Sequence, residues 1–237
     1  MRYSGGKAKT SGPLCAAIKS VCGDARAIVE PFCGGLSMTV RLQPREASDI
    51  SRPVITLVDA VRSGWVPPTK ISEEEYANLR LRRDDHHNPL VCFAGLCASF
   101  GGKWFGGLAR SHPNQLHPVA TSGVTLMRRV RQCASVNFRC ADYRDASVKI
   151  GDAIYCDPPY RGTTHAYATG VPFNSDDFWA WATDMSSQHL VMVSEFAAPP
   201  EWHSVWSMDR KVTARRDGSV INRKEQLWVM EKNLPCP

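Results

Sequence analysis

An apolar run that stops at two consecutive prolines constrains the fold of this chain more than any other feature. The run reads Ile154-Tyr155-Cys156 and is followed by Asp157-Pro158-Pro159-Tyr160. Proline has no N–H to donate to a strand ladder, so a strand here must leave its sheet at Pro158. In open α/β sheets, ligands bind outside the carboxyl ends of the strands. The sequence therefore predicts a buried strand that places Asp157 and Tyr160 at a ligand-binding edge.

Short apolar segments alternate with amphipathic ones along most of the chain. Strand-like patterns cover residues 27–30, 136–140, 153–156 and 190–194, and helical patterns cover 13–21, 36–42 and 178–185. A hairpin is expected near the end, with strands at 211–215 and 226–230 around a turn at Asp217-Gly218. Strands that alternate with helices predict an α/β sheet.

The segment from residue 61 to 132 has a different character. A turn-rich link at 64–69 leads to Ser72 and Glu75, whose spacing is that of a capping box at the start of a helix. Farther on, glycines, arginines, histidines and aromatic residues mix, most densely in 101–107. We expect a catalytic domain formed by residues 1–60 and 133–237, interrupted by an inserted region over 61–132.

The residues of the proline motif suit chemistry on an exocyclic amine. Such an amine is a poor nucleophile because its lone pair is delocalised into the ring, and two acceptors for its N–H groups would redirect that lone pair. Asp157 offers a carboxylate and Pro158 a carbonyl without a competing N–H. Tyr160 offers a flat face to a base that has left its stack. The same tetrapeptide also occurs as a rigid turn at an ordinary strand end, so by itself it is only a hypothesis.

Composition narrows the class of protein. The 237 residues are 43% hydrophobic, enough for a core, and no stretch has the roughly 18 uninterrupted apolar residues of a membrane span. The first residues lack the apolar core of a signal peptide, so we expect a cytoplasmic protein. The nine cysteines form neither a Cys-x-x-Cys pair nor a zinc spacing, which predicts no metal and no disulfide. The net charge of +6 favours a polyanionic partner. A cysteine nucleophile is not expected, since the single Pro-Cys step is Pro235-Cys236.

Six further segments, read in order, carry a resemblance to a known family. They are Tyr3-Ser4-Gly5-Gly6-Lys7, Glu30-Pro31-Phe32-Cys33-Gly34-Gly35, Ser48-Asp49-Ile50-Ser51, Ala141-Asp142-Tyr143, Val193-Ser194-Glu195 and the basic segment from Arg215 to Glu225. Together with the proline motif, they resemble the Dam family of DNA adenine methyltransferases of bacteria and phages, from residue 3 to about 230. The family's loop after the first strand often reads Phe-x-Gly-x-Gly, whereas Leu36 follows Gly35 here.

The resemblance implies the Rossmann-like α/β sheet of S-adenosylmethionine-dependent methyltransferases, with an inserted, mainly helical target-recognition region. It implies a catalytic loop of Asp157, Pro158, Pro159 and Tyr160. It also implies that S-adenosylmethionine is bound by Tyr3, Lys7, Phe32, Gly34, Asp49, Tyr143 and Asp157. Lys7 would pair with the cofactor carboxylate and Asp49 would accept from the ribose hydroxyls. Without the resemblance, Lys7 would be interpreted as a solvated lysine, Asp49 as a cap and Tyr143 as a core aromatic.

Basic and aromatic residues indicate where double-stranded DNA would bind. The candidates are Lys103, Trp104, Arg110, Tyr167, Arg215 and Arg216. Basic side chains interleaved with aromatic ones suit contacts with phosphates and bases. The alternative is a folded hairpin whose charges are solvated, with Tyr167 as a loop anchor.

The sequence thus predicts a site-specific enzyme that methylates the N6 amine of a flipped-out adenine in DNA by direct transfer. Cytosine-N4 methylation needs the same amine chemistry and stays an alternative, as do methylation of RNA or of protein glutamine and a catalytically silent DNA-binding relative. The sequence gives neither the recognition sequence nor the oligomeric state, and it does not show whether a partner restriction nuclease exists.

Overall fold

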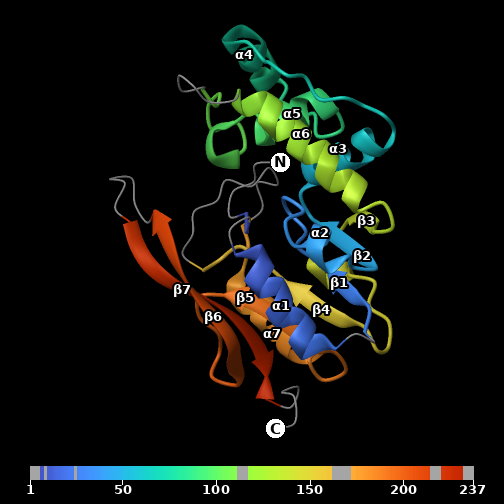
Figure 1. The fold of residues 1–237 in the computed structure, drawn as a ribbon, viewed down its shortest axis with the longest axis vertical. Helices are drawn as coiled ribbons and strands as arrows, with labels where there is room; N and C mark the ends of the chain where they lie inside the picture. The colour runs from blue at the N-terminus through green and yellow to red at the C-terminus, as the bar shows by residue number, and fades with distance from the viewer. Residues whose placement is uncertain are drawn as a thin grey trace.

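The computed structural model describes residues 6–7, 10–23, 26–110, 117–161, 172–213 and 220–231. Within these residues the chain forms a seven-stranded sheet in the order β3-β2-β1-β4-β5-β7-β6 (Figure 1). The strands are β1 (Ile28–Glu30), β2 (Glu46–Asp49), β3 (Asn137–Cys140), β4 (Ala153–Cys156), β5 (Leu190–Glu195), β6 (Trp202–Thr213) and β7 (Val220–Met230). The first five are parallel, and β7 runs antiparallel to both β5 and β6. The predicted α/β sheet is confirmed.

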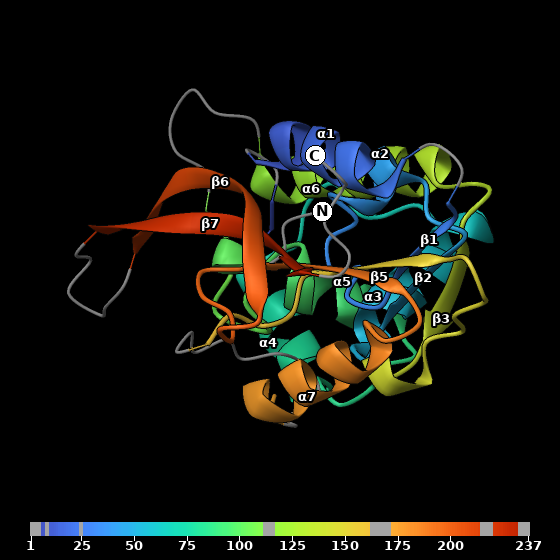
Figure 2. The same ribbon diagram turned by 90° about the horizontal axis from the view of Figure 1, so that it is seen from below.

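Helices cover both faces of the sheet. Helix α1 (Ser11–Cys22) and α2 (Thr39–Leu42) lie on one face, and α7 (Ser175–Met185) lies on the other (Figure 2). The central strands β4 and β5 are therefore buried along their whole length, as parallel strands usually are. Alternate side chains point to opposite faces: Tyr155 packs in the cluster that includes α1, while Ile154 and Cys156 pack in the cluster that includes α7.

The remaining helices gather at one end of the molecule (Figure 1). They are α3 (Arg52–Arg62), α4 (Glu73–Leu81), α5 (Pro89–Leu96) and α6 (Pro118–Gln132). Their shared core contains side chains from α3, α5 and α6, and it continues to Ala47 of β2. Helix α5 lies at its centre, with every residue from Val91 to Leu96 buried. The division at residue 61 stays a prediction, because α3 contains that residue and packs against both regions.

Local signals in the sequence explain where these helices begin. Ser72 Oγ accepts a hydrogen bond from the Glu75 N–H at 3.0 Å, and the Glu75 carboxylate accepts one from the Ser72 N–H at 2.7 Å. This is the predicted capping box, and it is confirmed. Asn88 caps α5 through its Oδ1, and Pro89 occupies the first turn, where its missing N–H costs nothing.

No helix in the described ranges is both long enough and apolar enough to cross a membrane. The eight cysteines within those ranges are free, and seven of the eight are buried.

Candidate active site

Four neighbouring strands end in acidic residues at one edge of the sheet. These strands lie side by side in the order β2, β1, β4 and β5. Strand β2 ends at Asp49, β1 at Glu30 and β5 at Glu195, and Asp157 directly follows β4. The carboxyl ends of parallel strands meet at the same edge, which gathers residues that lie far apart in the chain. Glu30, Asp49 and Glu195 are buried. The edge predicted to bind a ligand therefore carries a row of carboxyl groups.

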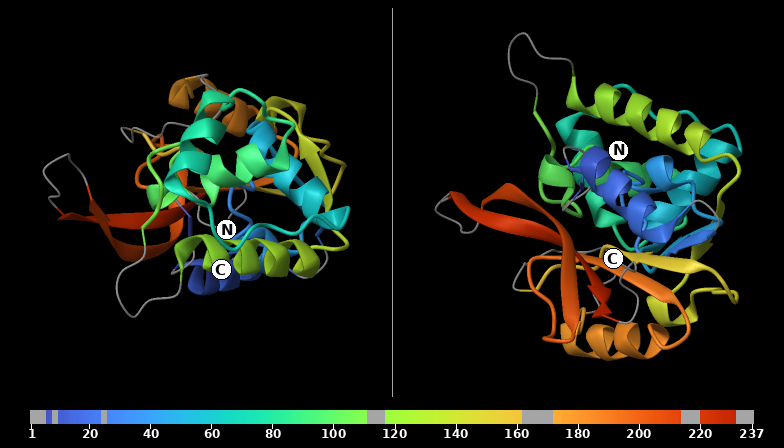
Figure 3. Two further views of the ribbon diagram at one scale, coloured as in Figure 1. Left: turned by 90° about the horizontal axis from the view of Figure 1, so that it is seen from above. Right: turned by 60° about the horizontal axis from the view of Figure 1, so that its bottom comes forward.

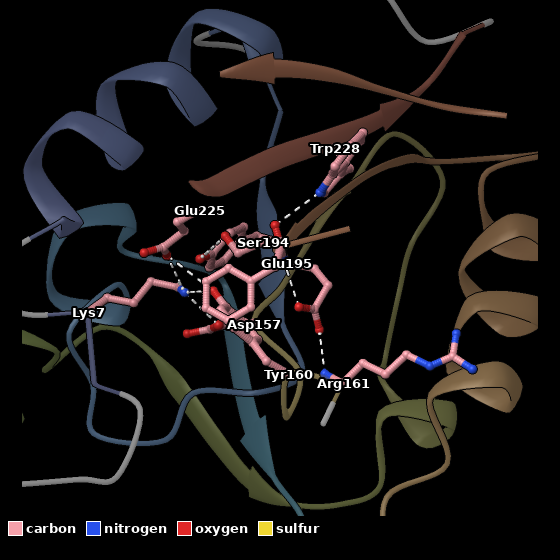
Figure 4. Close-up of polar contacts among 10 residues, drawn as sticks. Lys7, Asp157, Tyr160, Arg161, Ser194, Glu195, Glu225 and Trp228 are labelled. Atoms are coloured by element: carbon pink, nitrogen blue, oxygen red, sulfur yellow. Dashed lines mark hydrogen bonds and ion pairs between the residues drawn. The ribbon is translucent and has the colours of Figure 1, made fainter. Parts of the chain in front are cut away.

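The buried side chain of Lys7 lies against this row of carboxyl groups (Figure 4). Its Nζ atom is 2.7 Å from Asp157 Oδ1 and 2.6 Å from Glu225 Oε1. The same ammonium donates a hydrogen bond to the Tyr160 hydroxyl. The side chains of Lys7 and Glu225 are 1% and 0% exposed, and that of Asp157 is 22% exposed. All three N–H donors of the ammonium thus have an oxygen partner in the chain.

Tyr160, in the loop that follows β4, is held at its hydroxyl and at its ring. The Tyr160 hydroxyl donates to Glu225 Oε1 at 3.1 Å, and the Tyr160 ring forms a T-shaped contact with Phe196, with the ring centroids 4.6 Å apart. Burial raises the pKa of Tyr160 well above its ordinary value, and the charges of Asp157 and Glu225 raise it further. The phenol therefore stays neutral and keeps its proton for hydrogen bonding.

Glu195 fixes the segment that follows the loop. Its Oε2 accepts from the Arg161 N–H at 3.0 Å and its Oε1 from the Phe196 N–H at 2.7 Å, while its backbone carbonyl accepts from Trp228 Nε1 at 3.1 Å (Figure 4). Burial raises the pKa of the Glu195 carboxyl to about 7, against the effect of the two N–H donors. The Asp157 loop is thus anchored by β4 on one side and by Glu195 on the other.

Replacement of Glu195 by glutamine should flatten the dependence of stability on pH. Because the folded-state pKa of about 7 lies above the ordinary value of 4.5, the folded protein binds the extra proton. The stabilisation that this bound proton gives is complete below the unfolded-state pKa, and it is lost as the pH rises through the folded-state pKa. Denaturant unfolding at several pH values between those two should show a smaller fall in the free energy of unfolding for Glu195→Gln than for the wild type. Equal slopes would contradict this, since Asp49, whose pKa burial also raises, is common to both proteins.

Asp49 links the loops that follow β1 and β2. Its Oδ2 accepts from the Gly34 N–H and its Oδ1 from the Ser51 N–H, both at 2.8 Å. Burial raises the pKa of Asp49 to about 6 despite these two donors. Gly34 has a φ of 43°, in the left-handed region that favours glycine. The structure therefore brings together Gly34 and Asp49, which belong to two separate loops at the same edge of the sheet.

Leu36 explains how the departure from the family pattern is accommodated. It stands where the pattern Phe-x-Gly-x-Gly has its second glycine, and its φ of 61° is the left-handed conformation that glycine would take. A side chain in this conformation costs about 1–3 kcal/mol. Leu36 is fully buried in the core shared with the helices, and this burial offsets the strain.

The two aromatic residues expected at the cofactor lie in contact. The rings of Phe32 and Tyr143 are stacked with centroids 5.4 Å apart at an interplanar angle of 24°. Around them lie Phe173, Phe178 and Trp181, which belong to or flank α7. The Tyr143 hydroxyl is buried, with no hydrogen-bond partner among the described residues.

The candidates for DNA contact differ in exposure. Lys103 and Arg110 are exposed, and Arg110 pairs with Glu73 at 3.1 Å. Trp104 instead packs into the helical region, so closely against Gly95 that a Cβ there would collide with its ring. Phe100, which sequence reasoning missed, is 68% exposed in the same glycine-rich turn. The roles of these residues stay predictions. Four candidates lie outside the described residues: Tyr3, Tyr167, Arg215 and Arg216.

Sequence reasoning also did not single out Glu30, Glu195 or Glu225 as site residues. Their shared signal is a position at or near the edge where parallel strands end, which becomes visible only with the strand order. In the described ranges, no group of three or more His, Cys, Asp or Glu side chains is arranged to hold a metal ion.

Comparison with known proteins identifies the family. The sequence model of the D12 class N6 adenine-specific DNA methyltransferases matches residues 3–178, which include Lys7 and the Asp157 loop but not Glu195 or Glu225. Among solved structures, the crystal structure of SMU.472 complexed with SAH aligns at a TM-score of 0.35 with 11% identity, over 95% of this chain and 54% of that one. This chain thus spans about half the length of that protein. The family match confirms the resemblance noted in the sequence, and the chain belongs to the D12 class N6 adenine-specific DNA methyltransferase family.

Proposed function

We propose that this protein transfers a methyl group from S-adenosylmethionine to the N6 amine of an adenine rotated out of double-stranded DNA. The supporting observation is the Asp157 loop, which leaves β4 at the carboxyl edge of the sheet and is fixed there by Lys7 and Glu195. A rigid loop that presents a carboxylate and a proline carbonyl is suited to hold an amine in one orientation. Fixed acceptors at the site of developing charge are an effective form of catalysis, because they need no reorganisation during the reaction.

In this mechanism the residues of the loop act on the amine. Asp157 and the Pro158 carbonyl accept its two N–H groups and direct its lone pair to the methyl carbon. Asp157 then takes the proton that the nitrogen loses and passes it to water. S-Adenosylmethionine bound at this site would supply the electrophilic methyl group, with S-adenosylhomocysteine as the leaving group. Tyr160 stays neutral and offers its ring to the extruded base, while its hydroxyl remains bound to Glu225.

The residues at the edge fit a cofactor of this chemistry. Glu30 Oε2 is buried without a hydrogen-bond partner among the described residues. Burial raises the pKa of Glu30 well above its ordinary value, and the nearby charges of Asp157 and Asp49 raise it further. A ligand that carries a positive charge or N–H donors would satisfy this oxygen. Asp49 would hold the ribose hydroxyls, Gly34 would allow close approach, and Phe32 and Tyr143 would contact the adenine ring. Lys7, with its donors engaged by the chain, is better suited to Asp157 than to the cofactor carboxylate.

Replacement of Asp49 by alanine should weaken binding of S-adenosylmethionine. A lost hydrogen bond to a charged acceptor costs about 1.5–3 kcal/mol, which raises the dissociation constant about 10–150-fold. Titration calorimetry at constant pH measures this change, and denaturant unfolding checks that the loops held by Asp49 still fold. Unchanged affinity would mean that Asp49 serves only the Gly34 and Ser51 N–H groups.

Two elements that carry basic side chains lie on the same side of the molecule. The β6–β7 hairpin projects from the molecule on the same side as the turn that contains Lys103 and Phe100 (Figures 1 and 3). Arg223 and Lys224 belong to this hairpin, close to Glu225 in sequence. Basic side chains on both elements would contact phosphates, which position a duplex without reading its sequence.

Analysis of the product nucleosides tests the proposal. Duplex DNA is incubated with the protein and S-adenosylmethionine, digested and examined by mass spectrometry for N6-methyladenine. N4-methylcytosine alone would support the cytosine enzyme instead, and cofactor binding without any methylated base would indicate a silent relative. A duplex with 2-aminopurine at the target position should gain fluorescence on binding, because the base leaves its stack.

A further inference from the structure

We propose that Glu225 is a positioning residue of this active site, which holds the Lys7 ammonium beside Asp157 while the target amine binds. The inference rests on the proposed function and deepens it. Glu225 lies on β7, beyond the residues 3–178 that the family model matches.

The sheet topology explains how a residue of β7 reaches the site. Strand β7 is antiparallel to β5, and Gln226 pairs with Glu195 at the carboxyl edge. Glu225 therefore lies at this edge although it belongs to a strand that runs the opposite way. Alternation along β7 turns Glu225 to the same face as Leu227 and Val229, which pack in the cluster that includes α1.

Lys7 approaches Glu225 from that same face. Its backbone carbonyl accepts the N–H groups of Thr10 at 3.1 Å and Ser11 at 2.8 Å, so it is fixed to the start of α1. From there its side chain crosses to the sheet edge and meets a residue 218 positions away in sequence. The contact thus joins the segment just before α1 to β7.

Electrostatics gives this contact a function. An ammonium and two carboxylates that are this well buried are stable only as a group, since an unpaired buried charge is expensive. When the target amine approaches Asp157, it competes with Lys7 for that carboxylate. Because Glu225 also binds the ammonium, Asp157 can turn one of its oxygens toward the amine while Lys7 keeps a carboxylate partner. It also holds the Tyr160 hydroxyl, so one carboxylate steadies both neighbours of Asp157.

The Glu225→Gln variant tests this role with little change in shape. Loss of a charge-assisted hydrogen bond costs about 1.5–3 kcal/mol, so we expect kcat to fall about 10–150-fold. The dissociation constants for cofactor and for DNA should not change. Glu46→Gln is the matched control: Glu46 is also buried and pairs with Arg139 at 3.0 Å, but it begins β2 at the opposite edge. It should retain the wild-type kcat.

A double-mutant cycle with Lys7→Met separates positioning from structural support. If Glu225 acts through Lys7, Lys7→Met/Glu225→Gln should have the kcat of Lys7→Met alone, because the second change removes nothing further. Multiplying effects would overturn the proposal. Each rate is expressed per folded protein, measured by circular dichroism under the assay conditions, so the comparison holds even if one variant is less stable.

The ammonium can also be observed without turnover. In cofactor-free protein labelled with ¹⁵N-lysine, the Lys7 ammonium should give a proton–nitrogen signal protected from exchange, assigned by its absence from Lys7→Met. That protection should be lost in Glu225→Gln and kept in Glu46→Gln. Protection that survives in Glu225→Gln would overturn the proposal. A wild-type protein that methylates no DNA would instead count against the proposed function, and the exchange result would still decide the role of Glu225.

Discussion

The Asp157→Ala variant should remain folded and bind DNA, yet transfer methyl groups about 10²–10⁴ times more slowly than the wild type. The substitution removes the acceptor that orients the amine and receives its proton. The fold should survive because Asp157 is more exposed than Lys7 and Glu225, and because Lys7 keeps its 2.6 Å contact with Glu225. Single-turnover measurements with saturating cofactor isolate the chemical step, and fluorescence anisotropy reports DNA binding.

Asp152→Ala is the control for this variant. Asp152 lies just before β4, at the opposite end of the same strand, and accepts the Lys149 N–H at 2.8 Å. It should lose stability but keep the wild-type rate for the folded fraction. A rate for Asp157→Ala close to that of the wild type would refute the assignment of Asp157 as the catalytic carboxylate.

Strong local signals allowed most of the sheet to be predicted from the sequence. Two prolines end β4 at Cys156, and buried apolar runs define β5, because parallel strands in the middle of a sheet have apolar residues on both faces. The capping box at Ser72 predicts the start of α4 for a similar reason, since its two hydrogen bonds join residues within one turn.

The sequence predicts the terminal hairpin but not the bounds of its two strands. We expected strands over 211–215 and 226–230, whereas β6 begins at Trp202 and β7 at Val220. The pairing register of β6 shifts between Ser204 and Trp206, and such an irregularity interrupts the alternation by which a strand is recognised in sequence. On this edge strand, the polar residues Ser207, Asp209, Arg210 and Lys211 weaken the pattern further.

Only part of the candidate site can be predicted from the sequence, for a different reason. Lys7, Asp49 and Asp157 lie in short motifs, so the sequence indicates them directly. Glu195 and Glu225 acquire a role only because β7 pairs with β5, a contact that no local pattern specifies. Strand order likewise places Glu30 between Asp49 and Asp157. The sequence alone therefore lacks the non-local strand pairing, which places these three glutamates next to the Asp157 loop.

Replacement of Lys7 by methionine should lower the free energy of unfolding by about 3–5 kcal/mol, the usual cost of leaving a buried charge without its partner. Methionine fills a similar volume but leaves Asp157 and Glu225 facing each other with no cation. One of them must then take up a proton, so the loss should be smaller at acidic pH than at neutral pH. Denaturant unfolding of both proteins at each pH measures the difference.

The double variant Lys7→Met/Glu225→Gln decides between two roles for this lysine. If Lys7 serves mainly to neutralise the carboxylates, removing the charge of Glu225 should restore part of the lost stability, and affinity for S-adenosylmethionine should be nearly the same in all variants. If Lys7 instead pairs with the cofactor carboxylate, as the family resemblance implies, Lys7→Met should weaken cofactor binding markedly and destabilise the free protein little. The geometry favours the first result, because each N–H of the buried ammonium already meets an oxygen of Asp157, Tyr160 or Glu225.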